Sequence, residues 1–119
     1  MLVDTSVWVD HLRRRNETLV EILEQAQVWI HPFVIGELAC GNLASRAVLL
    51  DLLAELPHLP MVSHTEVLSF IEARRLMGRG LGWIDVHLLA SATLAKLPFW
   101  TVDRQLAAVA HELGVGSRN

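Results

Sequence analysis

Short apolar runs alternate along this chain with longer segments in which apolar residues recur at helical spacing. Side chains repeat every two residues along a strand and about every 3.6 residues along a helix, so the short runs predict buried strands and the longer segments predict helices. Strands are expected over residues 1–4, 28–30, 59–62 and 98–102. Helices are expected from Ser6 toward the arginines at 13–15, over 18–26, from Pro32 to about Gly41, over 43–56, from Ser63 to about Met77, over 83–96 and over 104–113.

Local signals support several of these helix boundaries. Ser6 is a predicted N-cap, and both Thr18 and Ser63 precede a glutamate at capping-box spacing. Pro32 suits the first turn of its helix. Residues 78–82 hold three glycines and are expected to form a flexible loop. Residues 83–96 are apolar nearly all round, which predicts a buried helix.

Strands that alternate with helices, joined by connections too long for hairpins, favour a parallel sheet with crossover helices. The predicted fold class is therefore α/β, a three-layer α/β/α sandwich with a short parallel sheet. A length of 119 residues indicates one domain, residues 1–119.

Composition narrows the setting of the protein. Hydrophobic residues make up 52% of the chain, which predicts that a partner covers part of its surface. No apolar stretch reaches the roughly 18 residues of a membrane span, and Asp4 stands where a signal peptide carries positive charge. The single cysteine, Cys40, fits a reducing compartment. A cytoplasmic protein without a membrane segment is expected.

The net charge of −3 argues against a generic nucleic-acid binder. Six of the ten basic residues nevertheless lie in two clusters, at positions 13–15 and at positions 74, 75 and 79. Local basic patches can contact phosphate groups on an acidic protein. Solvated helix ends explain either cluster equally well.

The chemistry is carried by four acidic residues, each of which follows an apolar run: Asp4, Glu37, Asp85 and Asp103. A carboxylate in a low-dielectric setting is costly unless a cation or hydrogen bonds compensate it. Asp4 and Asp103 end predicted strands, whereas Glu37 and Asp85 lie early in predicted helices. In a parallel sheet all four should converge on the carboxyl edge, where such folds place their ligands.

Oxygen ligands favour hard cations, so Mg²⁺ or Mn²⁺ is the expected cofactor. A metal held by carboxylates activates a water molecule and neutralises charge on a phosphate. The predicted chemistry is metal-dependent hydrolysis of a phosphodiester.

Four segments together carry a family resemblance. They are Leu2-Val3-Asp4-Thr5-Ser6-Val7-Trp8, Gly36-Glu37-Leu38-Ala39, Trp83-Ile84-Asp85-Val86-His87-Leu88-Leu89-Ala90 and Trp100-Thr101-Val102-Asp103. In this order they resemble the PIN-domain ribonucleases, and specifically the VapC toxins of bacterial type II toxin–antitoxin modules. The resemblance extends over essentially the whole chain.

The resemblance implies a PIN fold and an Mg²⁺- or Mn²⁺-dependent endoribonuclease that leaves 5′-phosphate and 3′-hydroxyl ends. It implies that Asp4, Glu37, Asp85 and Asp103 are the catalytic, metal-binding acids, with Asp4 and Asp85 as direct ligands. It also implies an RNA substrate (transfer, ribosomal or messenger RNA), a homodimer and a VapB-like antitoxin that covers an apolar groove beside the site. Further residues adjoin the acids and are candidates for lining the site or contacting substrate: Thr5, Ser6, Thr101 and Arg104.

Other polar and aromatic residues have more ordinary interpretations. His31 is expected in a loop and His87 in packing. The four tryptophans are candidates for stacking on bases, but Trp29, Trp83 and Trp100 are expected to pack in the core, which leaves Trp8 as the open candidate. Arg104 fits either a phosphate contact or an ion pair.

Two other functions compete with the nuclease. A non-catalytic module could keep the acidic pocket only to grip RNA or an antitoxin arginine. A DNA nuclease or RNA-processing enzyme could act without any antitoxin. A haloacid-dehalogenase-like phosphatase is disfavoured because Ser6 stands where it needs a second aspartate. A receiver domain is disfavoured because Lys96, the only lysine, lies at a helix end.

Overall fold

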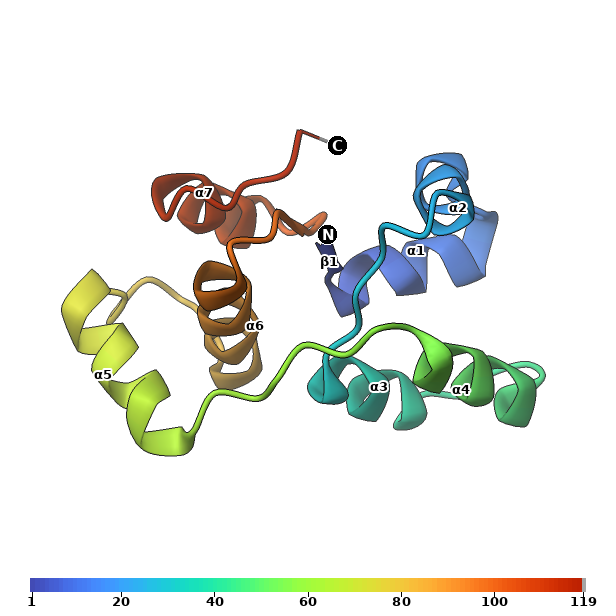
Figure 1. Ribbon diagram of the computed structural model, residues 1–119, viewed down its shortest axis with the longest axis horizontal. Helices are drawn as coiled ribbons and strands as arrows, with labels where there is room; N and C mark the ends of the chain where they lie inside the picture. Colours follow the sequence, from blue (N-terminus) through green and yellow to red (C-terminus); the bar gives the residue numbers. More distant parts are fainter. Residues whose placement is uncertain (119) are drawn as a thin grey trace.

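The computed structural model describes residues 1–118, in which two short strands are set among seven helices (Figure 1). The strands are β1 (Leu2–Val3) and β2 (Phe99–Trp100). The helices are α1 (Thr5–Arg14), α2 (Glu17–Glu24), α3 (Pro32–Ala39), α4 (Arg46–Glu55), α5 (His64–Arg74), α6 (Trp83–Ala95) and α7 (Arg104–Glu112).

The two strands pair in parallel, with Leu2 opposite Phe99 and Val3 opposite Trp100. Isolated parallel bridges extend this pairing on both sides, and they join Leu2 to Trp29, Ile30 to His58 and Phe99 to Gly116. The α/β class and the parallel pairing expected from the sequence are therefore confirmed. The division into three layers stays a prediction.

Two of the expected strands are not formed as strands. Within residues 28–30, Trp29 and Ile30 make isolated bridges to Leu2 and His58, and the Trp29 N–H donates to the Met1 carbonyl at 2.8 Å. The expected strand at 59–62 is wrong, since the bridge lies at His58 and Leu59 donates the last hydrogen bond, to Ile30. Proline at position 60 has no N–H to continue the ladder.

The helix caps agree with the sequence in part. Ser63 accepts a hydrogen bond from the Glu66 N–H, and Pro32 occupies the first position of α3, both as expected. Asn16 caps α2 instead of Thr18, because the helix already begins at Glu17. The Asn16 side chain accepts from the Leu19 N–H at 3.0 Å.

Two helix boundaries differ from expectation. α1 begins directly after Asp4, so Ser6 lies inside the helix and is not its N-cap. α5 ends at Arg74, before the expected Met77, because Arg75 adopts a left-handed conformation with a φ of 54°.

The core is formed around the strands and α6. Both strands are buried, and residues 86–92 of α6 are buried without interruption, as expected from their apolar sequence. Figure 1 shows α5, α6 and α7 on one side of β1 and α1 to α4 on the other. Among residues 1–118, no helix is both long and apolar enough to cross a membrane.

Candidate active site

Asp4 lies at the end of β1 and is 6% exposed. Its Oδ2 atom accepts hydrogen bonds from the Ser6 hydroxyl at 2.6 Å and from the Thr101 hydroxyl at 2.8 Å. Thr101 follows β2, and the parallel pairing brings it beside Asp4, whose N–H donates to the Trp100 carbonyl at 2.8 Å. The sheet therefore joins two segments nearly a hundred residues apart in one polar cluster.

Asp103 is connected to the same cluster through Thr101. The Asp103 N–H donates to the Thr101 hydroxyl at 3.1 Å. Its Oδ1 atom accepts from the N–H groups of Gln105 at 2.9 Å and Leu106 at 3.1 Å, so this aspartate is the N-cap of α7. These two hydrogen bonds fix the orientation of the Asp103 side chain at the start of α7.

Asp85 lies in the first turn of α6, as expected from the sequence, and its Oδ2 atom accepts from the Gly82 N–H at 3.1 Å. The pKa of Asp85 is raised above its ordinary value, first because burial penalises the charged form and then because of the charges on Asp4 and Asp103. The hydrogen bond from Gly82 partly offsets this increase. Asp4 and Asp103 are therefore the acids whose charges act on Asp85.

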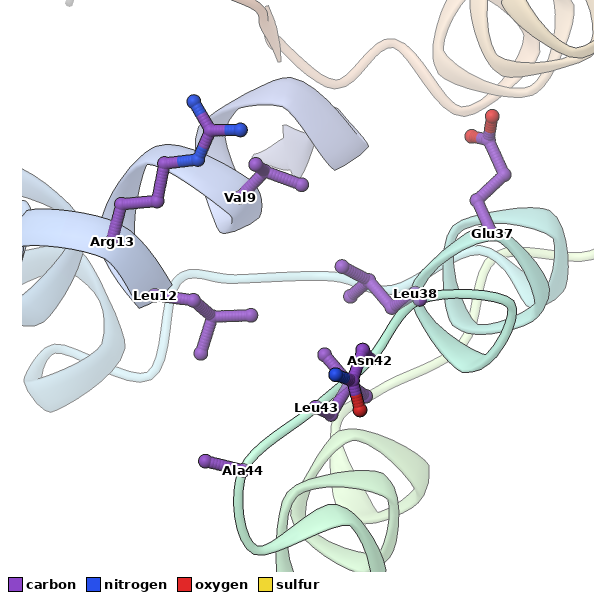
Figure 2. A pocket seen from close by; sticks show the side chains of 9 residues that line it. Val9, Leu12, Arg13, Glu37, Leu38, Asn42, Leu43 and Ala44 are labelled. Atoms are coloured by element: carbon purple, nitrogen blue, oxygen red, sulfur yellow. The ribbon is translucent and has the colours of Figure 1, made fainter.

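Glu37 occupies an adjacent position. Its Oε1 atom accepts from the Thr5 hydroxyl at 2.7 Å, which links α3 to the first residue of α1, next to Asp4. Glu37 also lines a pocket of about 480 Å³ with Arg13 and several apolar side chains. Figure 2 shows Arg13 on α1 and Glu37 on α3. Unlike Asp4 and Asp103, Glu37 is not a cause of the raised pKa of Asp85.

The carboxylate oxygens of the acids suit a divalent cation, but the arrangement of the acids does not. Asp4, Asp85 and Asp103 each leave one carboxylate oxygen outside the hydrogen bonds described above. Such oxygens are the preferred ligands of Mg²⁺ and Mn²⁺. Within residues 1–118, however, no group of three or more His, Cys, Asp or Glu side chains is arranged so that it could hold a metal ion. The acids of the cluster therefore supply suitable oxygens, but the described residues do not form a closed metal-binding group.

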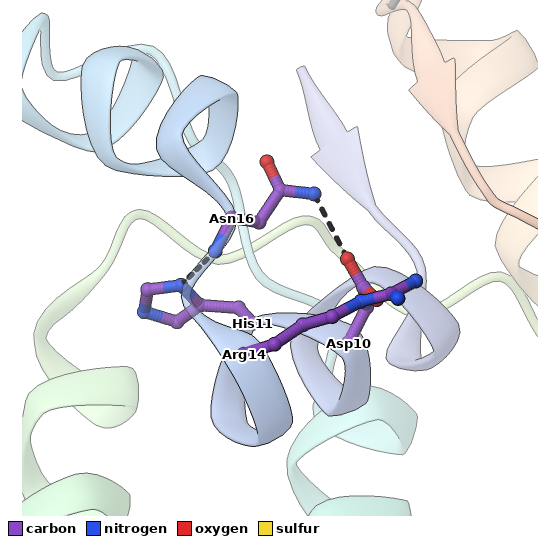
Figure 3. A network of polar contacts seen from close by, with 4 residues as sticks. All are labelled: Asp10, His11, Arg14 and Asn16. Carbon is purple, nitrogen blue, oxygen red and sulfur yellow. Dashed lines mark hydrogen bonds and ion pairs between the residues drawn. The ribbon is translucent and has the colours of Figure 1, made fainter.

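Much of the positive charge is engaged away from the acids. Arg14 pairs with Asp10 at 2.8 Å, and Arg15 pairs with Glu17 at 2.8 Å. Figure 3 shows Asp10 held by both Arg14 and Asn16, so these residues fasten the end of α1 to the start of α2. Within this basic cluster Arg14 and Arg15 are thus held in ion pairs, whereas Arg13 lines the pocket beside Glu37.

In the second basic cluster, Arg79 donates two hydrogen bonds of 3.0 Å to Glu112, and its carbonyl accepts from the Gln105 side chain. These contacts fasten the glycine-containing loop to α7. Arg104 is exposed in the first position of α7, next to Asp103.

The core packing expected for Trp83 is wrong, and the candidate left open, Trp8, is buried. Trp8 is only 4% exposed and packs in the core, whereas Trp83 is 39% exposed. Both tryptophans have apolar neighbours in the sequence, so composition alone does not distinguish them. Which side of a helix is covered depends on the elements that pack against it, and no local pattern contains that information.

The two histidines nearest the acids in sequence are both buried. His87 packs in the protein, as expected. His31 was expected in a loop, but its Nδ1 atom accepts from the Phe33 N–H at 2.9 Å and caps α3. Burial lowers the pKa of His31 from 6.5 to about 4, and the neighbouring His87 contributes to this decrease. Its position directly before Pro32 was the available signal for a cap.

Comparison with known proteins places these features in context. The family model described as PIN domain matches residues 1–112. Two curated proteins, each named Ribonuclease VapC32, come from Mycobacterium tuberculosis strains CDC 1551 / Oshkosh and ATCC 25618 / H37Rv. Each is 50% identical to this chain over 118 residues, which cover 97% of this chain and 94% of the relative. No solved structure matches the chain significantly.

Proposed function

Because this chain belongs to the PIN-domain family and is similar over nearly its full length to VapC ribonucleases, we propose that it is the toxin ribonuclease of a toxin–antitoxin pair. The proposed reaction is hydrolysis of RNA phosphodiester bonds, dependent on Mg²⁺ or Mn²⁺, which leaves 5′-phosphate and 3′-hydroxyl ends. The observation that carries the proposal is the polar cluster at the ends of β1 and β2, where the Thr101 hydroxyl donates to Asp4 and accepts from the Asp103 N–H.

The roles of the acids follow from their settings. Asp4 is held by two hydroxyls and buried, so its orientation is fixed before any ligand arrives. Asp4 and Asp85 would be direct ligands of the cation, and Asp103 would hold a ligand water or a second ion. Glu37 accepts a hydrogen bond from Thr5, the residue that follows Asp4, and would position the attacking water.

A bound Mg²⁺ or Mn²⁺ would supply water activation and neutralise charge on the phosphate. It would also offset the burial and the charges of Asp4 and Asp103, which together raise the pKa of Asp85. The chain's own contribution is to orient the carboxylates. The hydroxyls of Ser6 and Thr101 fix Asp4, and the Asp103 cap on α7 and the Gly82–Asp85 bond fix the other two acids.

The partners proposed with this function are an RNA substrate, a VapB-like antitoxin and a second copy of the chain. The proposed unit is a single three-layer domain. Exposed apolar side chains support coverage by protein partners, since Leu12, Val48 and Leu52 are 44%, 62% and 58% exposed. Leu12 and Leu52 also line a pocket of about 460 Å³ between α1, α2 and α4.

The test is cleavage of total cellular RNA by the purified chain with Mg²⁺, with Mn²⁺ and with EDTA. Asp4→Asn should lower the cleavage rate by at least about a hundredfold, the effect expected when a preorganised charge in an active site is lost. Asp51→Asn makes the same substitution at an exposed position of α4 and should retain wild-type activity. Full cleavage by Asp4→Asn, purified free of wild-type protein, would remove Asp4 from the proposed site.

The absence of a closed metal-binding group within the described residues favours one alternative, a binding module without catalysis. This alternative predicts RNA or antitoxin binding but no metal-dependent fragments from any RNA. Including single-stranded DNA in the same assay separates the RNA nuclease from a DNA nuclease, because only the latter would cut it efficiently.

A further inference from the structure

A continuous series of aromatic rings lies where α3, α5 and α6 begin. His31 contacts Phe33 with ring centroids 5.2 Å apart, and Phe33 contacts His87 at 4.8 Å. His87 contacts Trp83 at 4.7 Å, and Trp83 contacts His64 at 5.0 Å. The series begins with a histidine that is fully buried and ends with an exposed tryptophan and an exposed histidine.

Trp83 is held firmly although it is exposed. It is the first residue of α6, and the hydrogen bond from the Gly82 N–H to Asp85 fixes the helix start on which it stands. The loop before it is fastened to α7 through Arg79. His87 packs against its ring at an interplanar angle of 84°. The exposed part of Trp83 is therefore preorganised, which lowers the entropic cost of binding a ligand.

The position of Trp83 relative to the acids restricts what it can contact. Residues two apart in a helix point about 200° away from each other, so Trp83 and Asp85 lie on opposite sides of the α6 N-terminus. A helix with its side chains is roughly 10 Å wide. Trp83 therefore cannot contact a phosphate held at Asp85, but it can contact a nucleotide a few positions along the same strand.

The setting of Trp83 suits a nucleobase. The series of rings connects residues in or beside the first turns of α3, α5 and α6. The first turns of α5 and α6 each carry an acid, Glu66 and Asp85, so recognition at Trp83 would depend on its exposed ring and not on positive charge. The bases of a single-stranded nucleic acid stack on aromatic side chains, and Trp83 stands two residues before Asp85, where we propose that the cleaved phosphate is held.

We propose that Trp83, with His64 beside it, stacks on an unpaired nucleobase of the RNA that flanks the cleaved phosphodiester. This inference rests on the proposed ribonuclease function and adds a substrate-binding residue to it. Trp83 acts by holding the strand in register with the acids, and it takes no part in bond cleavage.

The experiment measures binding of a fluorescently labelled, mixed-sequence single-stranded RNA to the full chain in EDTA, where metal-dependent cleavage cannot interfere. Base stacking on one aromatic residue is worth about 1–3 kcal/mol, so Trp83→Leu should weaken binding by at least about fivefold. Trp83→Phe keeps a smaller aromatic face and should lose less RNA affinity than Trp83→Leu. The matched control is Leu94→Ala, which changes an exposed apolar residue at the far end of α6 and should bind as wild type.

A second RNA probe separates stacking on the bases from contacts with the sugar–phosphate backbone. On an RNA of the same length with abasic riboses, wild type and Trp83→Leu should bind equally. In a cleavage assay, Trp83→Leu should raise KM and leave kcat unchanged. Equal binding of base-containing RNA by wild type and Trp83→Leu would overturn the proposal, as would equal losses on both probes.

Two further outcomes separate this inference from the function on which it rests. Wild-type protein that binds RNA through Trp83 but never cleaves it refutes the ribonuclease and keeps the stacking site. Metal-dependent cleavage with no effect of Trp83→Leu on binding refutes the stacking site alone. A change of oligomeric state in Trp83→Leu, with RNA affinity unaltered, assigns the exposed ring to a protein contact and also refutes it.

Discussion

Acidification should destabilise this protein through His31. The His31 Nδ1 atom accepts the Phe33 N–H, so the neutral ring carries its proton on Nε2. That Nε2 atom is buried and has no hydrogen-bond partner among the described residues. A second proton would have to go onto Nδ1, where it would break the cap of α3 and place a charge in the core. Both effects disfavour the protonated form in the folded state.

The size of the effect follows from the two pKa values of His31. The pKa is about 4 in the folded protein and 6.5 as the ordinary value. Between these values the unfolded chain binds a proton that the folded chain does not, so stability falls as pH falls. At about 1.4 kcal/mol per pH unit, the free energy of unfolding should decrease by about 3 kcal/mol between pH 6.5 and pH 4. The whole free energy of unfolding of a typical domain is only about 5–15 kcal/mol.

His31→Asn tests this reasoning because asparagine is a good N-cap and does not titrate. The smaller side chain lowers stability at every pH, so only the pH dependence is compared. Urea unfolding followed by circular dichroism from pH 4 to pH 7 should show a weaker dependence in His31→Asn than in wild type. His58→Asn, which removes an exposed imidazole, is the control and should keep the wild-type dependence. Equal pH dependence in wild type and His31→Asn would refute the reasoning.

Two other substitutions have definite expected outcomes. Asp85→Asn should raise the free energy of unfolding of the metal-free protein at pH 7 by about 0.5–1 kcal/mol, the size of a single partly exposed charge interaction. The raised pKa of Asp85 disfavours folding only where the unfolded carboxyl is ionised, so this gain should vanish as pH falls below the ordinary value; a gain that persists in acid contradicts the explanation. Gly80→Ala should lower the free energy of unfolding by about 1–2 kcal/mol, because the φ of 75° is unfavourable for alanine. Displacement of the Gln105 side chain, which would lie 2.9 Å from the new Cβ, should lower it by about 1 kcal/mol more. Gly78→Ala has a similar φ of 70° and open space around the Cβ, so thermal melts that show equal losses for the two variants would exclude the Gln105 contribution.

The local sequence was a good guide wherever a short pattern controls the structure. The apolar run before Asp4 forms β1, and residues 83–96 gave the buried helix α6 with Asp85 in its first turn. The Ser63 cap was correct for the same reason, because capping depends on atoms three residues apart. The strand expected at 59–62 does not form because strand pairing depends on a distant segment, and that segment pairs through Ile30 with His58, before the expected range.

The sequence by itself singled out the four acids that we propose carry the chemistry, because a carboxylate after an apolar run is costly if it is buried. In the structure Asp4 is buried, Glu37 and Asp85 are half-buried, and Asp103 is exposed. Only the tertiary structure decided how they are held. Asp4 is fixed by Thr101, 97 residues away, through the pairing of β1 with β2. The same packing buries Trp8 and exposes Trp83, although the two have similar neighbours in the sequence. The physical reason is that polarity and helix propensity are local properties, whereas burial and side-chain contacts arise between segments that meet only in the folded chain.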